Sequence, residues 1–336
     1  MYSIISSVSD IDSIQWKELV ANSPTASFFQ TRECYDFYAT LSFLKPFIYA
    51  VSENDQLVGI LCGYVISDGN LLKQFFSRRA IVPGGLLLDA GISHIALQQL
   101  LKHATLQLKK QAIYLEIRNY NDFSSFHSTF ELAGFRFKAH LNFHVATPDL
   151  ESSLQKLNSS KRRQIKLSLK AGATIVDAIT DDEIAQFYYL LKELYKNKIK
   201  SPLFPLEFFR KLNALQYGKI LVVKFNDKVV GGIACVFLDN RVVSEWFVCG
   251  DDGIEKNLYP SVLATWAGIE YAATNGFERF DFMGAGKPDE SYGVREFKSK
   301  FGGELVEHGR FLYVCMPLLY TFGKFIVQKR KRSNGK

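Results

Sequence analysis

The sequence predicts an α/β protein with mixed (α+β) sheets, built from two similar halves that arose by duplication. In each half, hairpins of antiparallel strands are followed by a helix and one further strand, an order that gives a mixed sheet flanked by helices. The halves also share local sequence, because AVSENDQLVGILCG at 50–63 resembles VKFNDKVVGGIACV at 223–236. Two hairpins can be alike by chance, but the shared order of elements favours duplication.

The first half, residues 1–150, is expected to form one domain. Asn54 and Asp55 mark a turn between two apolar strands, and Gly134 ends a helix, since these residue types favour turns and helix ends. The expected helices cover 12–21, 94–110 and 126–133, and the expected strands cover 47–51, 57–65, 71–76, 113–117 and 141–145.

The second half, residues 151–336, is expected to form the other domain. It begins with a basic linker helix, for which Ser159 or Ser160 is a typical N-cap and Gly172 a typical stop. A second helix is expected over 181–197, and strands are expected over 220–225, 229–237, 242–248 and 311–315.

One stretch, 259–303, reads as helix, strand, loop and helix. Pro260 suits the first helical position, because its missing N–H would be unpaired there anyway. Apolar residues then recur at helical spacing. A strand is expected over 279–283, where Asp281 alternates with two phenylalanines, and a compact helix over 292–298.

Composition narrows the class of protein. The 336 residues suffice for two domains, and the net charge of +7 favours anionic partners such as phosphates, nucleic acid or lipid headgroups. The five cysteines lie far apart without a CxxC pair, which argues against zinc and against a disulfide framework. The N-terminus lacks the pattern of a signal peptide, and no run of about 18 apolar residues is present to span a membrane. We therefore expect a cytoplasmic protein.

The motifs of several enzyme classes are missing. GAGK at 284–287 lacks the spacing of a phosphate-binding loop, and no GxGxxG for a dinucleotide follows a strand. Neither a HExxH metal motif nor a GxSxG nucleophile elbow occurs. The simplest remaining chemistry is direct transfer between two bound substrates, without a metal.

The linker helix carries Lys161, Arg162 and Arg163 in its first turn. Cations there oppose the helix dipole. One interpretation is a solvated basic face. The other is an anion site, where guanidinium groups and helix-end N–H groups converge on a phosphate of a substrate.

Several runs taken together resemble the FemABX-type transferases, and within that group the GNAT-like or BioF2-like acetyltransferases. They are KLNSSKRRQIKLSLKAG, VVGGIACV, YPSVLATWAGIEYA, GFERFDFMGAG and YGVREFKSKFGGELVE. The resemblance covers about 154–316 and explains 1–150 as the first of two tandem GNAT-like domains.

The resemblance implies acyl transfer to an amine. Its best-known members move an amino acid from aminoacyl-tRNA to the peptide of a lipid-linked or nucleotide-linked peptidoglycan precursor. The donor, aminoacyl-tRNA or acyl-CoA, is then a substrate and not a permanently bound cofactor. The FK pair of the family corresponds to Phe297 and Lys298, so that Lys298 would face the reacting carbonyl and stabilise its oxyanion. The alternative is an ordinary surface lysine, because Lys300 lies nearby.

Other candidate residues surround this pair in the sequence. Glu245 and Asp281 lie on expected strands, where a buried carboxylate acts either as a general base or as a structural hydrogen-bond acceptor. The candidates for substrate binding are Arg295 and Tyr292 for a carboxylate or phosphate, and Tyr259 and Trp246 as the lining of a cleft or as core residues.

The sequence does not decide the identity of the acyl donor or the structure of the C-terminal tail. The position of the CoA-binding loop [QR]xxGx[GA] reads DDGIEKNLYPSV, which lacks the loop and is acidic, and no coiled-coil arm for tRNA interrupts 180–215. The tail PLLYTFGKFIVQKRKRSNGK is either a disordered, charged segment or a helix in peripheral contact with the inner face of the membrane.

Two alternative functions of the whole protein are an acyl-CoA-dependent N-acetyltransferase of a small amine or amino sugar, and a non-catalytic RNA- or membrane-binding protein on the same scaffold.

Overall fold

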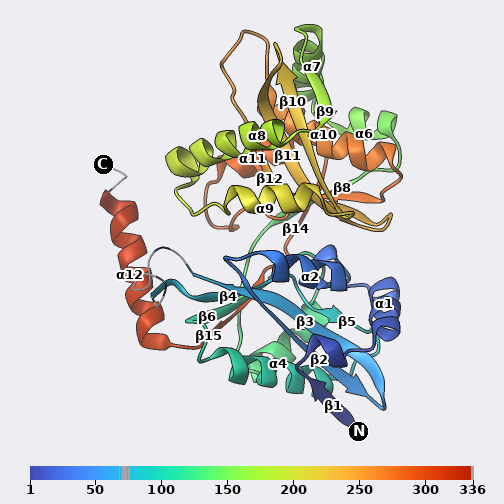
Figure 1. Ribbon diagram of the computed structural model, residues 1–336, viewed down its shortest axis with the longest axis vertical. Coiled ribbons are helices and arrows are strands. Elements are labelled where there is room, and N and C mark those ends of the chain that lie inside the picture. The colour runs from blue at the N-terminus through green and yellow to red at the C-terminus, as the bar shows by residue number, and fades with distance from the viewer. Residues whose placement is uncertain (68, 70–73, 75, 334–336) are drawn as a thin grey trace. The chain divides into compact units, whose positions relative to one another are not determined.

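The computed structural model describes residues 1–67, 69, 74 and 76–333 (Figure 1). The chain divides into two compact units. The first consists of Met1–Ala139 together with His308–Lys336, and the second of His140–Glu307. Each unit contains one mixed sheet with helices on both faces.

The sheet of the first unit has the strand order β1-β2-β3-β4-β6-β15-β7, with β5 paired to β3. All neighbours are antiparallel except β4 and β6, which α4 connects. The strands are β1 (Tyr2–Ile5), β2 (Lys45–Glu53), β3 (Gln56–Ile66), β4 (Arg79–Gly84), β5 (Leu87–Leu88), β6 (Tyr114–Asn119), β7 (Arg136–Lys138) and β15 (Arg310–Val314). The helices are α1 (Ser13–Asn22), α2 (Arg32–Thr40), α4 (His94–Leu108), α5 (His127–Leu132) and α12 (Pro317–Ser333), with short 3-10 turns η1 (Val8–Asp10), η2 (Phe28–Gln30) and η3 (Ser124–Phe126).

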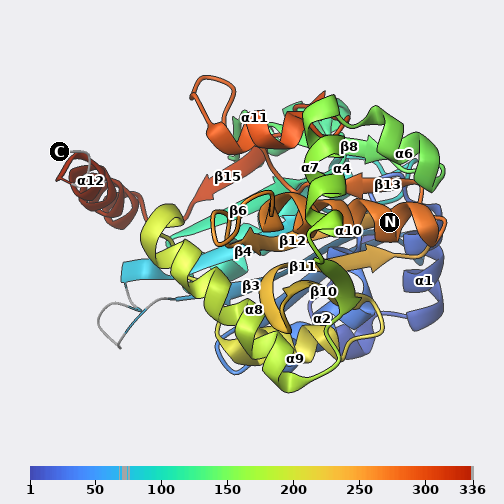
Figure 2. The ribbon, with the colours of Figure 1, turned by 90° about the horizontal axis from the view of Figure 1, so that it is seen from above.

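The sheet of the second unit has the order β14-β8-β13-β12-β11-β10-β9. Its strands are β8 (Asn142–Ala146), β9 (Thr174–Asp177), β10 (Gly218–Phe225), β11 (Lys228–Leu238), β12 (Val242–Gly250), β13 (Arg279–Asp281) and β14 (Glu304–Val306). Its helices are α6 (Leu150–Lys156), α7 (Ser159–Lys170), α8 (Asp181–Leu194), α9 (Leu206–Asn213), α10 (Pro260–Thr274) and α11 (Gly293–Ser299), and a π-helical turn, η4 (Tyr195–Ile199), extends α8. In Figures 1 and 2, α8 and α9 lie on one face of this sheet and α10 on the other.

The first hairpin of each unit has the same construction. Asn54 and Asp55 have φ of 50° and 66°, and Asn226 and Asp227 have φ of 49° and 61°. Such pairs of left-handed residues form the tight turns that match the twist of antiparallel strands. Each hairpin also has a shift in strand register close to its turn, after Val51 in the first unit and after Val223 in the second. The expected duplication is therefore visible in the backbone.

The structure divides the chain differently from the expected 1–150 and 151–336. The strand β8 precedes residue 150 but pairs with β13 and β14 of the second unit. The strand β15 follows residue 151 but pairs with β6 and β7 of the first unit. Both strands carry the apolar alternation of an ordinary strand, and this pattern does not specify which sheet a strand joins.

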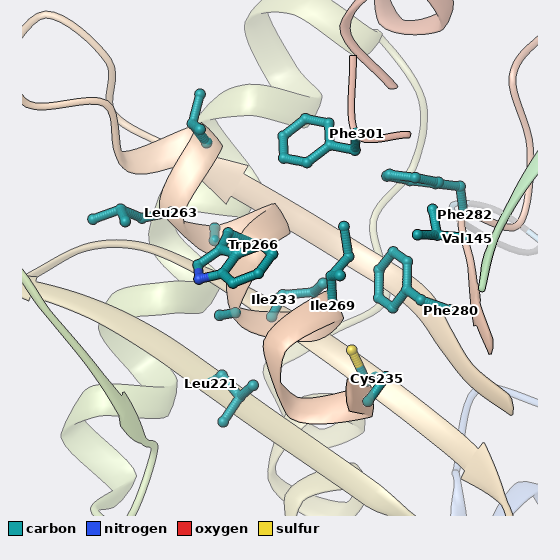
Figure 3. Close-up of a cluster of buried hydrophobic side chains, with 14 of the residues drawn as sticks. Val145, Leu221, Ile233, Cys235, Leu263, Trp266, Ile269, Phe280, Phe282 and Phe301 are labelled. Atoms are coloured by element: carbon teal, nitrogen blue, oxygen red, sulfur yellow. The ribbon is translucent and has the colours of Figure 1, made fainter. Parts of the chain in front are cut away.

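The core of the second unit is built on α10, which is apolar on nearly all sides and therefore buried. Figure 3 shows Trp266 and Ile269 of this helix packed against Ile233 of β11 and Phe280 of β13. Pro260 is its first residue, as expected. This packing fixes β12 and β13, the two strands on either side of α10 in the chain.

Several expected elements differ in their limits. The helix expected over 181–197 is an α-helix to Leu194 and a π-helical turn beyond it. The strand expected over 279–283 ends at Asp281. Most of the strand expected over 71–76 lies outside the described residues. The tail is a helix over 317–333, in place of a disordered segment. Within the described part of the chain, no helix combines the length and the apolar character needed to cross a membrane.

Candidate active site around Glu245 and Lys298

The candidate site lies where two parallel strands of the second unit separate. β12 and β13 pair only over Val242–Ser244 and Arg279–Asp281. Beyond this point β12 contains a bulge, since Cys235 of β11 faces Glu245 and the preceding Ala234 faces Phe247, which leaves Trp246 as the extra residue. The chain leaves β13 at the same level, so that Glu245 lies at the opening between the strands.

Glu245 is a buried carboxylate, and one of its two oxygens accepts no hydrogen bond from the residues that the structure describes. The residue is 5% exposed, and its Oε1 lies 3.0 Å from Lys298 Nζ. Its Oε2 is buried without a hydrogen-bond partner among the residues that the structure describes. Burial raises the pKa of this carboxyl, and the Lys298 ammonium opposes the shift. A carboxylate in this state is prepared to accept a hydrogen bond, and then a proton, from a ligand.

Lys298 is buried as well, with a side chain only 10% exposed. Its ammonium donates hydrogen bonds to the backbone oxygens of Phe282 at 2.8 Å and Gly284 at 2.9 Å, in addition to pairing with Glu245. An ammonium has three donors, and these three acceptors use all of them. The alternative of an ordinary surface lysine does not fit this burial. A substrate carbonyl would have to replace one of the three acceptors to bond Lys298.

Asp281 has its hydrogen bonds satisfied within the protein. Its Oδ1 accepts from Asn142 Nδ2 at 2.7 Å and from the Met283 N–H at 2.6 Å, and His144 Nε2 lies 3.2 Å from Oδ2. Burial raises the pKa of this carboxyl, but the hydrogen bonds and the neighbouring His144 outweigh it and hold the pKa below its usual range. These contacts fix the backbone after β13, where Met283 has a φ of 56°. The structural interpretation of Asp281 therefore fits better than that of a general base.

Arg295 and Tyr292 support the loop that follows β13. Arg295 Nε donates to the Ala285 oxygen at 2.9 Å, and its Nη2 donates to the Lys287 oxygen. The ring of Tyr292 covers Gly286, where an added Cβ would lie 2.7 Å from a ring carbon. Tyr292 is 43% exposed and is available to a substrate, whereas the Arg295 guanidinium is largely engaged with the loop.

Trp246 and Tyr259 are part of the packing around the opening. The Trp246 ring meets Phe208 edge-on, with 4.9 Å between ring centroids, and is stacked beside Phe247. Tyr259 is the N-cap residue of α10, and its N–H donates to Ser168 Oγ at 2.9 Å. Of the two interpretations, core packing is evident for both residues.

The basic turn of α7 does not bring its three cations together. Lys161 is buried, with Nζ 4.2 Å from the centroid of the Phe297 ring, so that Phe297 forms a cation–π pair as well as core contacts. Arg162 Nη1 donates to two carbonyl oxygens at the end of α6, at 2.6 and 2.7 Å. Arg163 is exposed, and its side chain makes no hydrogen bond or ion pair with the residues that the structure describes. The cap of α7 is Asn158, one residue before the expected serines.

Tyr195 lies near the candidate site but was not among the expected residues. Its ring is tilted against Phe247, with 6.1 Å between ring centroids, and burial raises the pKa of its phenol to about 12. It is the first residue of the π-helical turn η4, and such turns are frequent at functional sites. The sequence gives no sign of the turn, because the apolar spacing continues through it.

Comparison with known proteins identifies the fold. Residues 155–299 match the acetyltransferase (GNAT) domain family. Among solved structures, FemX is similar with a TM-score of 0.70 and 14% identity, over 95% of this chain and 99% of that chain. A tandem GNAT protein from the clavulanic acid biosynthesis pathway has a TM-score of 0.60 and 13% identity, over 94% of this chain and 99% of that one. No curated protein sequence matches the chain.

A third similar structure is the C-terminal domain of a protein described as a lysylphosphatidylglycerol synthetase, from Agrobacterium fabrum. Its TM-score is 0.57 and its identity 11%, over 89% of this chain and 90% of that chain. These likenesses confirm the expected fold of two tandem GNAT-like domains and the resemblance stated from the sequence.

Proposed function

We propose that this chain, an acyltransferase whose residues 155–299 match the acetyltransferase (GNAT) domain family, transfers an aminoacyl or acyl group to an amine of a cell-envelope acceptor. The observation that supports the proposal most directly is Glu245, a buried carboxylate with a free oxygen at the opening between β12 and β13. A peptidoglycan precursor is the first candidate acceptor.

The residues of the site suggest a direct transfer. The acceptor amine donates an N–H to Glu245 Oε2 and attacks the carbonyl carbon of the donor. The new C–N bond forms, the bond from that carbon to the leaving oxygen or sulfur breaks, and Glu245 passes the amine proton to the leaving group. Lys298 holds the other oxygen of Glu245 and, after exchanging a backbone acceptor, is placed to stabilise the oxyanion.

The donor is proposed to be an aminoacyl ester of tRNA. In an acyl-CoA enzyme the N–H groups at the start of the helix after β12 hold the pyrophosphate. Here Asp252 Oδ1 accepts from the Ser261 N–H at 3.0 Å, and the Tyr259 oxygen accepts from Val262 and Leu263 at 3.0 Å. A carboxylate therefore stands where a phosphate would bind, and it repels anions.

The acceptor is proposed from the names of the similar structures, which are FemX and a lysylphosphatidylglycerol synthetase. The second name denotes an aminoacyl group carried by a membrane phospholipid, which supports an acceptor in the cell envelope. The choice of an amine as the acceptor group rests on the FemABX resemblance. A lipid-linked acceptor resides in a membrane, so the proposal includes peripheral contact of the enzyme with the inner face of the bilayer.

A second candidate is an acyl-CoA-dependent N-acetyltransferase that modifies a small amine or amino sugar. It is favoured by the family description, which names acetyl transfer, a reaction with acetyl-CoA as donor substrate. A non-catalytic RNA- or membrane-binding protein is disfavoured, because such a protein would not need a buried ion pair with a free carboxylate oxygen.

A paired transfer assay tests the proposal. The purified chain receives peptidoglycan precursors, amino sugars and small amines as acceptors, with a labelled aminoacyl-tRNA pool in one arm and labelled acetyl-CoA in the other. Label that moves from tRNA to a precursor amine is the expected result. Transfer from acetyl-CoA alone would establish the second candidate, and no transfer to precursors, amino sugars or small amines from either donor would contradict an acyltransferase of this class.

A further inference from the structure

The helix α12 carries an exposed apolar stripe. Leu318, Phe322 and Phe325 are 89%, 56% and 63% exposed. They stand four and three residues apart, which places them on one face of a helix. In Figures 1 and 2, α12 extends from the end of β15 beyond the sheet of the first unit. Three large side chains therefore lie side by side in water on this helix.

The same helix is strongly basic. Lys324 is exposed, with its Nζ 5.6 Å from the centroid of the Tyr320 ring. The sequence continues with Lys329, Arg330, Lys331 and Arg332, and 317–333 contains no acidic residue. Four of these five cations stand near the C-terminal end of the segment in the sequence. Exposed aromatic residues together with a basic run are the composition of helices that lie in the interface of an anionic bilayer.

The beginning of α12 is held by the first unit. The N–H groups of Cys315 and Met316 donate to the Ile113 oxygen at 2.9 and 3.0 Å. Tyr320 packs edge-on against Tyr114 of β6, with 5.7 Å between centroids. The helix is thus anchored on one side through Tyr320, while the stripe is directed away from the unit.

We propose that α12 binds the surface of an anionic phospholipid bilayer, with the stripe of Leu318, Phe322 and Phe325 in the lipid interface and the basic run against the headgroups. The positive charge of α12 together with its apolar stripe favours an anionic bilayer over other binding partners. A second copy of α12 would bring five more cations against the first five, and RNA would leave the stripe in water. The inference deepens the proposed function, on which its purpose rests, because it would hold the enzyme near a lipid-linked acceptor.

Vesicle co-sedimentation of the full chain tests this inference. Vesicles contain phosphatidylcholine alone or phosphatidylcholine with phosphatidylglycerol. The test variant is Phe322→Glu with Phe325→Glu. The matched control is Ile95→Glu with Leu106→Glu, two residues that are 62% and 56% exposed on α4 of the same unit. A second variant changes the basic run by Lys329→Gln, Arg330→Gln, Lys331→Gln and Arg332→Gln.

We expect wild type and control to bind the anionic vesicles, and both α12 variants to bind at least roughly tenfold more weakly, with binding of wild type weakened by salt. The inference would be overturned if the test variant and the control bound the vesicles equally, or if wild type did not bind them. It would also be overturned if the α12 variants lost self-association of the protein and kept vesicle binding. Sedimentation needs no turnover, and transfer to a water-soluble acceptor should be unchanged in the α12 variants. The experiment therefore distinguishes an error in the membrane-binding inference from an error in the proposed transfer activity.

Discussion

The Lys298 ammonium and the Glu245 carboxylate form a buried ion pair, with 3.0 Å between Nζ and Oε1. The pair connects α11, which follows the loop after β13, to the bulge in β12. It therefore closes one side of the opening between the strands. Since both groups are buried, removing one leaves the other without its opposite charge. The structure of the site therefore depends on this contact, and under the proposed function the activity should depend on it as well.

Replacing Lys298 by methionine should lower both stability and transfer. An unpaired buried charge costs about 3–5 kcal/mol, which urea unfolding measures directly. The double variant Lys298→Met with Glu245→Gln should recover part of this stability without recovering transfer. Lys300→Met, at the exposed neighbouring lysine, is the control and should change neither. Full stability in Lys298→Met would show that the pair is not buried as described.

Glu245→Gln leaves the buried Lys298 ammonium without an ionised partner, so this variant should be less stable than wild type. Measured where it remains folded, it should slow transfer by about 10²–10⁴-fold, the usual contribution of a general base. The base acts ionised, so the wild-type rate should fall as pH drops through the raised pKa of Glu245, above the ordinary value of 4.5. The raised pKa also means that wild type loses stability relative to Glu245→Gln as pH rises through that pKa. A pH–rate profile with the same acid limb in both proteins would exclude Glu245 as the base.

Asp281 should make stability sensitive to acid. The hydrogen bonds from Asn142 and Met283 and the neighbouring His144 hold the pKa of Asp281 below its usual range. Its contribution is therefore present above the unfolded pKa and lost as pH falls through the folded one. Asp281→Asn should cost about 2–4 kcal/mol near neutral pH and flatten the dependence of Tm on pH. The control Asp289→Asn, at an exposed residue, should leave both unchanged.

Asp252→Asn tests the assignment of the donor. Removing the charge beside the first turn of α10 frees the site for an anion, so acetyl-CoA should bind roughly tenfold more tightly, while the KM for aminoacyl-tRNA stays within about twofold. Asp251→Asn, at the neighbouring exposed carboxylate, is the control. Calorimetric titration with CoA gives the comparison. Tight CoA binding already in wild type would contradict the donor proposed here.

Local signals predicted much of the fold. Asn226 and Asp227 adopt the left-handed turn that their side chains favour, and Pro260 begins α10 because it lacks an N–H. The assignment of β8 and β15 to their sheets was missed, since partner choice depends on contacts far apart in the chain.

The candidate site was predicted only in part, because it also depends on contacts between residues far apart in the chain. Glu245 and Lys298 were named, but nothing local shows that they meet across two elements. Lys161 was expected either on a solvated basic face or in an anion site, whereas its long alkyl chain lets it turn inward onto the Phe297 ring. Tyr195 was missed because a π-helical turn leaves no mark in the apolar pattern.

The most direct test of the account is single-turnover transfer of a labelled aminoacyl group to a peptidoglycan-precursor amine. Wild type, Glu245→Gln and Lys300→Met are compared at matched thermal stability. The account predicts transfer by wild type and Lys300→Met, and a loss of about 10²-fold or more in Glu245→Gln. Equal rates in all three proteins would show that the reaction does not take place at Glu245.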